Sequence, residues 1–483
     1  MKCKFHKQTL LIDRRLQLVY VLLFSIASMK SLAQPKPSLQ QQAWHDMEFY
    51  LFMHFGPNTF TDQEWGRGNE KEEVFDPVNL DCDQWCRITK AAGAKGIIIT
   101  AKHHDGFCLW PSRFSTHTVR ESKWKNGRGD VLKELSTACK KYGLKFGVYL
   151  SPWDRNHPRY GTPGYNDVFV NMLKEIFTHY GPVWELWWDG ANGEGPGGKK
   201  QVYDFRRFEN EVRKISPKTI IFSYIGPDIR WCGNEEGIAG TTNWNTLDTA
   251  GFTRGAGSPP QDSLNTGNKY GHHWIPEECD VSIRPGWFYH KIEDDQVKTP
   301  AQLFDLYVNS VGRGANLLLN VPPDTRGLIT SCDSAALVGF CTLRNKAFAN
   351  DLSKKGKGYV ILHNGIRPSP ALNDGDEKTV SKSLYPGIGS MSIEFNIPER
   401  VNCIVLKESL ADGQHCSSFS LLLLNDKHEM IKKITGTTIG RKRIILFPEE
   451  RVGYVELSIR EQKGVSSISG IETYLLDGGL IKK

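Results

Sequence analysis

The chain has 483 residues, of which 39% are hydrophobic, 24% charged and 11% aromatic. This balance is typical of a folded globular protein and excludes a disordered, collagenous or coiled-coil chain, and the length allows a large domain with an additional module. The formal net charge is +7, but residues 1–33 hold six basic residues and one acidic residue, which leaves 61 − 6 = 55 basic and 54 − 1 = 53 acidic residues, or +2, in the rest of the chain. The basic excess is therefore mostly N-terminal, and we expect no nucleic-acid partner.

The N-terminus has the pattern of an export signal. A basic stretch precedes the apolar run 18–27, and the small residues Ser31 and Ala33 follow at the positions that a signal peptidase reads. The pattern predicts a signal peptide over residues 1–33, with Gln34 as the new N-terminus and a periplasmic or extracellular location. The alternative is a membrane anchor, although the run is shorter than the roughly 20 residues that span a bilayer. No other long apolar run follows, so we expect no membrane span in the mature protein.

The eleven cysteines show no scaffold pattern. Cys3 lies in the predicted signal peptide, and the other ten are scattered without the dense spacing of a disulfide framework. Cys82 and Cys86 lie four apart in a predicted helix, where both share one face. No second ligand pair follows at zinc-site spacing, so the pattern favours buried thiols over zinc. The sequence leaves open whether one or two disulfides form after export.

Apolar runs that alternate with amphipathic stretches predict a mainly parallel α/β domain. The predicted strands are Phe49–Phe55, Gly96–Ala101, Lys145–Ser151, Val183–Asp189, Thr219–Gly226, Asp280–Ile283 and Asn316–Val321. The predicted helices are Leu80–Ala92, Val131–Tyr142, Val168–Tyr180, Val202–Ile215 and Pro300–Val311. This alternation over about 300 residues favours a (β/α)8-type barrel, and no glycine fingerprint follows the first strand, as a dinucleotide-binding fold would require.

The tryptophans mark the extent of the functional domain. All 13 lie between Trp44 and Trp287, which indicates one ligand-binding unit rich in large rings. After about Lys354 the pattern changes to short alternating runs separated by polar turns, which predicts a C-terminal antiparallel β-sandwich. We assign residues 34–353 to the barrel, residues 354–358 to a linker and residues 358–483 to the sandwich.

Unusual polar residues occur where the predicted strands end. His54 closes the first strand, His103 and His104 follow the second, Tyr149 lies in the third and Asp189 ends the fourth. The C-terminal ends of barrel strands form one face, which carries the active site in this architecture. We therefore expect these side chains to converge in one pocket.

Two acidic positions are candidates for the chemistry. Asp189 follows a buried apolar strand beside tryptophans and precedes the flexible Gly190. This position favours a nucleophile that attacks a sugar carbon. The alternative is that Asp189 caps the next helix. A retaining glycosidase needs a second carboxyl about 5–5.5 Å away that is protonated at rest. Glu235 and Glu236 lie beside Trp231 and Cys232, where we expect partial desolvation to favour the acid form. Spacing alone leaves the choice between the two glutamates open.

A set of ordered motifs resembles glycoside hydrolase family 29, the α-L-fucosidases. The likeness runs from about Trp44 to Leu328, and its motifs are His54-Phe55-Gly56, Glu64-Trp65-Gly66, Lys102-His103-His104-Asp105-Gly106-Phe107, Trp187-Trp188-Asp189-Gly190 and Gly314–Val321. The resemblance implies a retaining α-L-fucosidase that needs no metal and no cofactor and acts on fucosylated oligosaccharides or glycoconjugates. It implies Asp189 as the nucleophile, and a substrate-binding set of His54, Glu64, His103, His104 and Tyr149, with Trp65 beside them.

A finer likeness concerns the linkage. Gly233-Asn234-Glu235 and the segment Asp280–Tyr289 are similar to the branch of the family that acts on α-1,3 and α-1,4 linkages. In that branch the acid/base aligns with Glu235, and Trp287 is expected to pack on the apolar face or methyl group of fucose. Glu277 and Glu278 are the nearby alternatives for the acid.

Two rival functions stay open from the residues. One is a carbohydrate-binding protein without catalysis that uses the same pocket. The other is a metal-dependent barrel hydrolase built on His54, His103, His104 and Asp189.

Overall fold

The computed structural model describes residues 34–254, 257–383 and 389–481. The predicted signal peptide, residues 1–33, lies outside these ranges. Within them, no helix has the length and apolarity needed to cross a bilayer.

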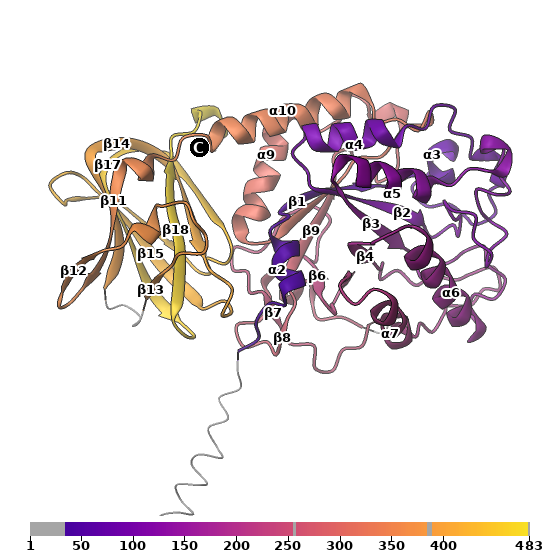
Figure 1. Ribbon diagram of the computed structural model, residues 1–483, viewed down its shortest axis with the longest axis horizontal. Coiled ribbons are helices and arrows are strands. Elements are labelled where there is room, and N and C mark those ends of the chain that lie inside the picture. The colour runs from indigo at the N-terminus through magenta and orange to yellow at the C-terminus, as the bar shows by residue number, and fades with distance from the viewer. Residues whose placement is uncertain (1–33, 255–256, 384–388, 482–483) are drawn as a thin grey trace, which may run out of the picture.

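Eight parallel strands close into a barrel, as the sequence predicts (Figure 1). They pair in the order β1-β10-β9-β6-β5-β4-β3-β2. Their bounds are β1 (Phe49–Met53), β2 (Gly96–Lys102), β3 (Lys145–Leu150), β4 (Glu185–Trp187), β5 (Ile220–Ser223), β6 (Ile229–Trp231), β9 (Glu277–Ser282) and β10 (Asn316–Asn320). All eight run in the same direction, so their C-terminal ends share one face.

Helices cover the outside of the barrel. The main ones are α4 (Cys82–Ala91), α5 (Val131–Tyr142), α6 (Gly164–His179), α7 (Phe205–Ile215), α9 (Pro300–Asn309) and α10 (Ser331–Ala347). Shorter ones are α2 (Leu39–His45), α3 (Pro57–Thr61) and α8 (Gln261–Thr266). Local signals set several ends: the Asp130 side chain accepts from the Lys133 N–H before α5, and Gly143 takes the left-handed φ of 68° after it.

The barrel departs from strict alternation at β5 and β6. The connection between these strands contains no helix. In the described residues of the β6–β9 connection, the regular elements are α8 and the two-stranded sheet of β7 (Thr246–Leu247) and β8 (His273–Trp274). The sequence did not predict β6, because it has only three residues and carries a charged side chain, Arg230. The Arg230 guanidinium is fully buried and donates to the carbonyl of Leu264 at 2.7 Å.

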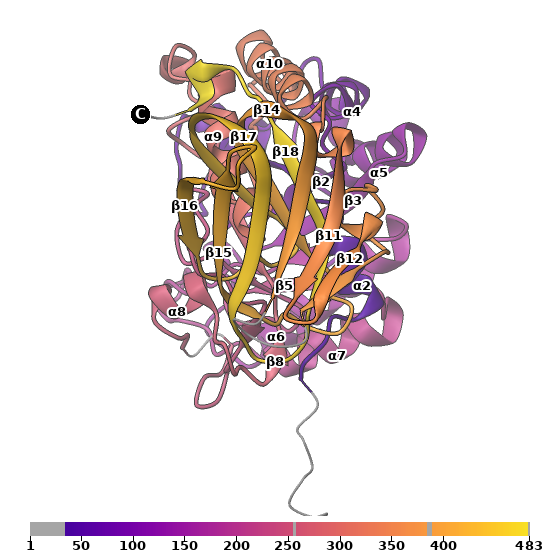
Figure 2. The same ribbon diagram turned by 90° about the vertical axis from the view of Figure 1, so that its left-hand side faces the viewer.

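The C-terminal strands form an antiparallel unit beside the barrel, as predicted (Figure 2). Their bounds are β11 (Gly356–Leu362), β12 (Gly365–Pro368), β13 (Ser381–Ser383), β14 (Ser390–Glu408), β15 (Cys416–Leu424), β16 (Met430–Gly436), β17 (Arg443–Gln462) and β18 (Ser466–Tyr474). The hydrogen bonds join all of them into one sheet, because β14 pairs first with β11 and then with β18, and with β17 throughout. Its core includes Ile393, Phe419, Leu421, Val455 and Ile471.

The segment predicted as a linker is part of regular structure. Lys354 and Lys355 end a 3₁₀ turn, and Gly356 and Gly358 lie in β11. A Cβ on Gly358 would lie 2.4 Å from the carbonyl oxygen of Ser369. These glycines therefore permit close backbone packing. From composition alone, the same glycines are assigned to a linker.

Buried polar contacts join the sheet to the barrel. The Lys442 ammonium lies 2.6 Å from a carboxylate oxygen of Glu48, and the Asn245 N–H donates to Gln414 Oε1 at 2.8 Å. Burial opposes both charges, but Lys442 and Arg441 hold the pKa of Glu48 below its usual range. Tyr307 and Glu48 in turn raise the pKa of Lys442. The two units are therefore fixed to one another.

The cysteines of the described residues are free thiols. Cys82 and Cys86 are buried on α4, as the helical spacing predicts, and Cys86 Sγ lies 3.9 Å from Cys139 Sγ on α5. Burial raises the pKa of the Cys82 thiol well above its usual range, so Cys82 stays protonated.

Candidate active site

A pocket of about 210 Å³ opens at the C-terminal ends of the barrel strands. Its lining residues are Phe52, His54, Glu64, Trp65, His103, His104, Tyr149, Trp187, Asp189, Gly190, Ala191, Tyr224, Trp231, Glu235, Asp280 and Trp287. All nine residues singled out in the sequence are therefore brought together, although they span 234 positions (287 − 54 + 1). The parallel topology explains this convergence, since each residue lies at the end of a strand or in the loop after it.

Asp189 lies two residues beyond β4 and is held at both carboxylate oxygens. Tyr149 OH donates to Oδ2 at 3.1 Å, and the Ala191 N–H donates to Oδ1 at 2.6 Å. Partial burial raises the pKa of Asp189, while these two hydrogen bonds act in the opposite direction. The carboxylate is thus oriented without a cation against it, which suits a nucleophile.

The residue after Asp189 must be glycine. A Cβ on Gly190 would lie 2.0 Å from the ring of Tyr224. The backbone therefore passes directly against an aromatic wall of the pocket, and this contact fixes the path of the loop that carries Asp189.

Three neutral histidines form one side of the pocket. Burial lowers the pKa of both His54 and His104 to about 3, and it lowers that of His103 well below the usual value. His54 Nδ1 contacts Asn320 Oδ1 at 2.9 Å, and His104 Nδ1 contacts Ser151 Oγ at 2.8 Å. A neutral imidazole offers one donor and one acceptor, which matches the hydroxyl groups of a sugar.

His104 also faces the candidate nucleophile. Its Nε2 lies 3.9 Å from Asp189 Oδ2, beyond direct hydrogen-bond distance. The ring of His103 lies 4.1 Å from that of His104, centroid to centroid. These histidines therefore surround the carboxylate without forming an ion pair that would neutralise it.

Glu64 supports the opposite loop. Its two oxygens accept the backbone N–H groups of Trp287 at 2.9 Å and Phe288 at 3.1 Å, and Oε1 lies 2.8 Å from His290 Nε2. A Cβ on Gly286 would lie 2.5 Å from Oε1, so this glycine lets the loop approach the carboxylate. Glu64 thus positions Trp287 in addition to lining the pocket.

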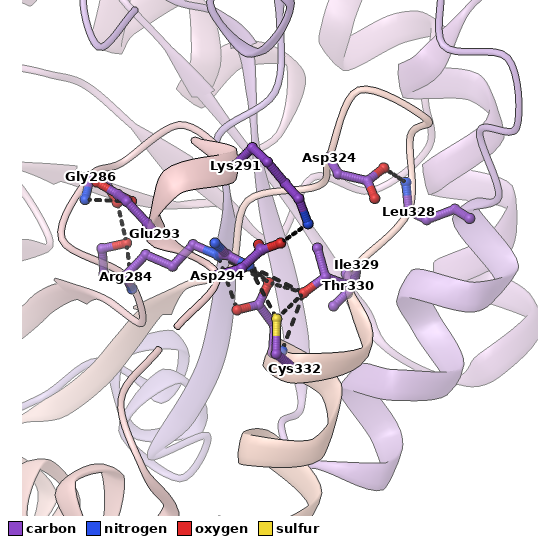
Figure 3. A network of polar contacts seen from close by, with 12 residues as sticks. Arg284, Gly286, Lys291, Glu293, Asp294, Asp324, Leu328, Ile329, Thr330 and Cys332 are labelled. Atoms are coloured by element: carbon purple, nitrogen blue, oxygen red, sulfur yellow. Dashed lines mark hydrogen bonds and ion pairs between the residues drawn. The ribbon is translucent and has the colours of Figure 1, made fainter. Parts of the chain in front are cut away.

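A buried polar network anchors the start of the same loop (Figure 3). Arg284 donates from Nε to Asp333 at 3.1 Å and from Nη2 to Asp294 at 3.0 Å. Gly286 donates its N–H to Glu293 at 3.2 Å. Because Arg284 and Asp333 are both fully buried, the loop that leads to Trp287 is fixed at its base.

Trp65 lies at the mouth of the pocket. It is 55% exposed and makes edge contacts with His104 and Trp153, at ring-centroid distances of 5.5 and 5.6 Å. An exposed ring at a pocket mouth offers a face for a ligand to pack on.

Glu235 lines the pocket, but its side chain is exposed rather than partly desolvated as the sequence analysis expected. Trp231 Nε1 donates to Asp280 at 2.8 Å, and Cys232 Sγ donates to the carbonyl of Asn234 at 3.1 Å. Glu235 instead meets the indole of Trp287, whose Nε1 donates to Oε2 at 3.2 Å.

The alternative acids do not line the pocket. Glu236 is exposed, and its backbone forms a bridge with Val281. Glu278 is buried in the barrel interior, where it accepts from Trp187 Nε1 at 2.8 Å. Glu277 points the other way, 3.7 Å from the Arg230 guanidinium, and burial raises its pKa to about 8. Of the four glutamates considered as the acid, Glu235 is therefore the one that lines the pocket.

Some lining residues were not singled out in the sequence. They are Phe52, Trp187, Gly190, Ala191, Tyr224, Trp231 and Asp280. Phe52 lies inside a strand and could have been found from the two-residue alternation of side chains, since His54 shares its face. Asp280 has no such neighbour among the nine site residues singled out in the sequence. Tyr224 carries no such signal, because it lies in the helix-free turn after β5.

The described residues do not support the alternative of a metal-dependent hydrolase, because its four candidate ligands do not form a cluster of metal-binding atoms. Within the described ranges, the one group of three or more His, Cys, Asp or Glu side chains with donor atoms within 4.8 Å of one another is Cys232, Glu277 and Cys279. None of the four residues of that alternative belongs to it.

The closed parallel barrel, with carboxylates, neutral histidines and tryptophans in one pocket at its C-terminal face, defines a glycoside hydrolase of the (β/α)8 class. The α-L-fucosidase family model matches residues 25–342, and the chain belongs to that family. It is an α-L-fucosidase, as the resemblance in the sequence implies.

Known proteins support this assignment over most of the chain. Alpha-L-fucosidase 1 of Arabidopsis thaliana is 40% identical over 423 residues, which cover 86% of this chain and 82% of the relative. A glycoside hydrolase 29 family member from an unknown rumen bacterium is 37% identical with a TM-score of 0.81, covering 92% of this chain and 78% of that one. The Ruminococcus gnavus GH29 fucosidase E1_10125, solved in complex with fucose, is 29% identical with a TM-score of 0.84, covering 93% and 96%.

Proposed function

We propose that this α-L-fucosidase works by double displacement with retention, using Asp189 as the nucleophile and Glu235 as the acid/base. The supporting observation is that two carboxyls of different surroundings line one pocket. Asp189 is partly buried and held by Tyr149 and Ala191, and Glu235 is exposed and held by Trp287. Two such carboxyls are what a retaining glycosidase requires.

The first step forms a bond between Asp189 and the anomeric carbon of fucose. The bond from that carbon to the leaving oxygen breaks, and this oxygen takes the proton of Glu235. In the second step Glu235, now ionised, removes a proton from water as the water oxygen attacks the same carbon. The Asp189 ester is released, and fucose leaves with its original anomeric configuration.

The neutral rings of the pocket would bind the sugar. His54, His103 and His104 can each donate or accept at a hydroxyl group without bringing a charge. Trp287 and Trp65 offer apolar faces for the ring and methyl group of fucose, as the family likeness implies. Glu64 would act on the sugar partly through the loop that it holds.

The linkage and the location are further parts of the proposal. The motifs around Glu235 and Trp287 favour α-1,3- and α-1,4-linked fucose on branched glycans. The N-terminal pattern favours an exported enzyme, in the periplasm or outside the cell, where it would meet such glycans.

A single experiment tests the mechanism and the linkage together. The wild-type chain is incubated with α-1,2-, α-1,3-, α-1,4- and α-1,6-fucosylated oligosaccharides, and the first fucose released is followed by proton NMR. We expect α-L-fucose first, from the α-1,3 and α-1,4 substrates. Release of β-L-fucose would refute retention, and preferred cleavage of α-1,2 or α-1,6 linkages would refute the linkage assignment.

A further inference from the structure

Asp280 is the fourth carboxyl that lines the pocket, beside Glu64, Asp189 and Glu235, and it has no role so far. It lies in β9, and alternation along the strand places it on the inner face with Glu278 below and Ser282 above. Glu278 bonds to Trp187 inside the barrel and Ser282 to Asn320 at its rim. Asp280 therefore lies at the floor of the pocket, and the residue is 4% exposed.

One of its oxygens is already engaged. Trp231 Nε1 donates to Asp280 Oδ1 at 2.8 Å, and the Trp231 ring packs against Tyr224 at a centroid distance of 5.0 Å. Among the described residues, Trp231 is the one side chain that hydrogen-bonds to this carboxyl, which also interacts with its own backbone N–H. The other oxygen is thus available to a ligand.

The surroundings disfavour a negative charge on Asp280. In the part of the chain that the structure describes, no lysine or arginine lines the pocket, and its three histidines are neutral. Burial, together with the charges of Glu235 and Glu278, raises the pKa of Asp280 well above its usual range. The other titratable groups that line the pocket are acids or phenols: Glu64, Asp189, Tyr149 and Tyr224. None of them supplies a compensating positive charge.

We propose that Asp280 is a further substrate-binding residue that acts as a neutral carboxylic acid, accepting from Trp231 at Oδ1 and donating from Oδ2–H to an oxygen of the fucosyl unit. This inference rests on the proposed function only in taking a fucosyl unit as the occupant of the pocket. The carboxyl of Asp280 then donates a hydrogen bond to the sugar, whereas the residue type alone would suggest one more anion in the pocket.

The proposal makes asparagine the conservative replacement. Like a protonated carboxyl, a carboxamide has one accepting oxygen and one donating group. We expect Asp280→Asn to keep the dissociation constant for free L-fucose, measured by isothermal titration calorimetry, within about threefold of wild type. Asp280→Ala should weaken binding about tenfold or more, the loss of about one hydrogen bond.

The pH profile and the infrared spectrum supply independent readouts. Because the charge of the pocket does not change, Asp280→Asn should leave the basic limb of the kcat/KM profile in place. The infrared difference spectrum between wild type and Asp280→Asn at neutral pH should show the band of a protonated carboxyl. The infrared measurement judges the proposal even if Asp280→Ala does not fold.

Several results would overturn the proposal. They are a loss of fucose binding in Asp280→Asn as large as in Asp280→Ala, a shifted basic limb, wild-type binding in Asp280→Ala, or an infrared difference that shows only a carboxylate. Because fucose binding is measured without turnover, these outcomes are separate from a failure of Asp189 or Glu235 in catalysis.

Discussion

The indole Nε1 of Trp287 donates to Oε2 of Glu235 at 3.2 Å, and the backbone N–H of the same tryptophan donates to Glu64 at 2.9 Å. One residue thus connects the loop after β6 with the loop after α3 and spans the mouth of the pocket. Glu235 is otherwise an exposed side chain, and this hydrogen bond ties its carboxyl to the pocket wall.

Replacing the proposed acid should affect substrates unequally. We expect Glu235→Gln to lower kcat/KM on natural glycans at least about a hundredfold, but much less on aryl fucosides with good leaving groups, because an activated phenolate departs without protonation. The basic limb of the pH–rate profile should also disappear. A plot of rate against leaving-group pKa measures the effect.

Glu236→Gln is the matched control. Its side chain is exposed on the next residue and does not line the pocket, so we expect normal kinetics. If the two variants exchange behaviours, the acid moves by one residue. If both are normal and Glu278→Gln shows the leaving-group effect, the loop assignment is wrong.

Removing the proposed nucleophile should stop turnover while the fold persists. We expect Asp189→Gly to lower kcat by about 10⁴-fold or more, since no neighbouring group can replace the attacking carboxylate. Added azide should yield an inverted fucosyl azide, detected by NMR, without restoring retention. Near-normal hydrolysis with an unchanged circular dichroism spectrum would place the nucleophile elsewhere.

The polar residues at the strand ends could be predicted from the sequence, and the topology of the barrel explains why they meet. His54, His103 and Asp189 follow apolar runs, and parallel closure brings such positions to one face regardless of their separation. The five predicted helices and seven predicted strands are all present, with ends that differ by a few residues.

Other features depend on tertiary contacts that no local pattern encodes. The exposure of Glu235 could not be read from its neighbours, because Trp231 turns toward Asp280 instead. The strand β6 is too short for a periodic signal and is held by pairing with β5 and β9. The long helix α10 was also missed, since Ala336, Leu337 and Phe340 give it only a small buried stripe.

The base of the Trp287 loop should be sensitive to loss of its buried cation. Arg284→Ala leaves the fully buried Asp333 without its partner, and we expect the free energy of unfolding to fall by about 3–5 kcal/mol. Urea denaturation measures the change. Replacing both partners, in Arg284→Met with Asp333→Leu, should recover much of the loss, whereas equal destabilisation in the double variant would show that the pair itself is not the cause.

The neutral histidines predict a loss of stability in acid. The pKa of His54 is about 3 in the folded chain and about 6.5 when unfolded, so the unfolded state binds the proton first as the pH falls. The stabilisation is present above pH 6.5 and is lost between pH 6.5 and 3, at up to about 1.4 kcal/mol per pH unit.

A variant can isolate this contribution. Between pH 6.5 and 4.5, His54→Asn should lose about 2 kcal/mol less unfolding free energy than the wild type. The exposed His272 is the control, and His272→Asn should follow the wild-type curve. Parallel curves for His54→Asn and wild type would mean that His54 is protonated in the fold.

The most direct test of Asp189 as the nucleophile is covalent trapping. The wild-type chain is incubated with 2-deoxy-2-fluoro-L-fucosyl fluoride, digested and sequenced by tandem mass spectrometry, with Asp189→Gly as the control. The double-displacement mechanism predicts one fluorofucosyl ester per chain, on Asp189, that disappears in the variant. A label on another carboxylate, or full inactivation of the enzyme without any label, would contradict it.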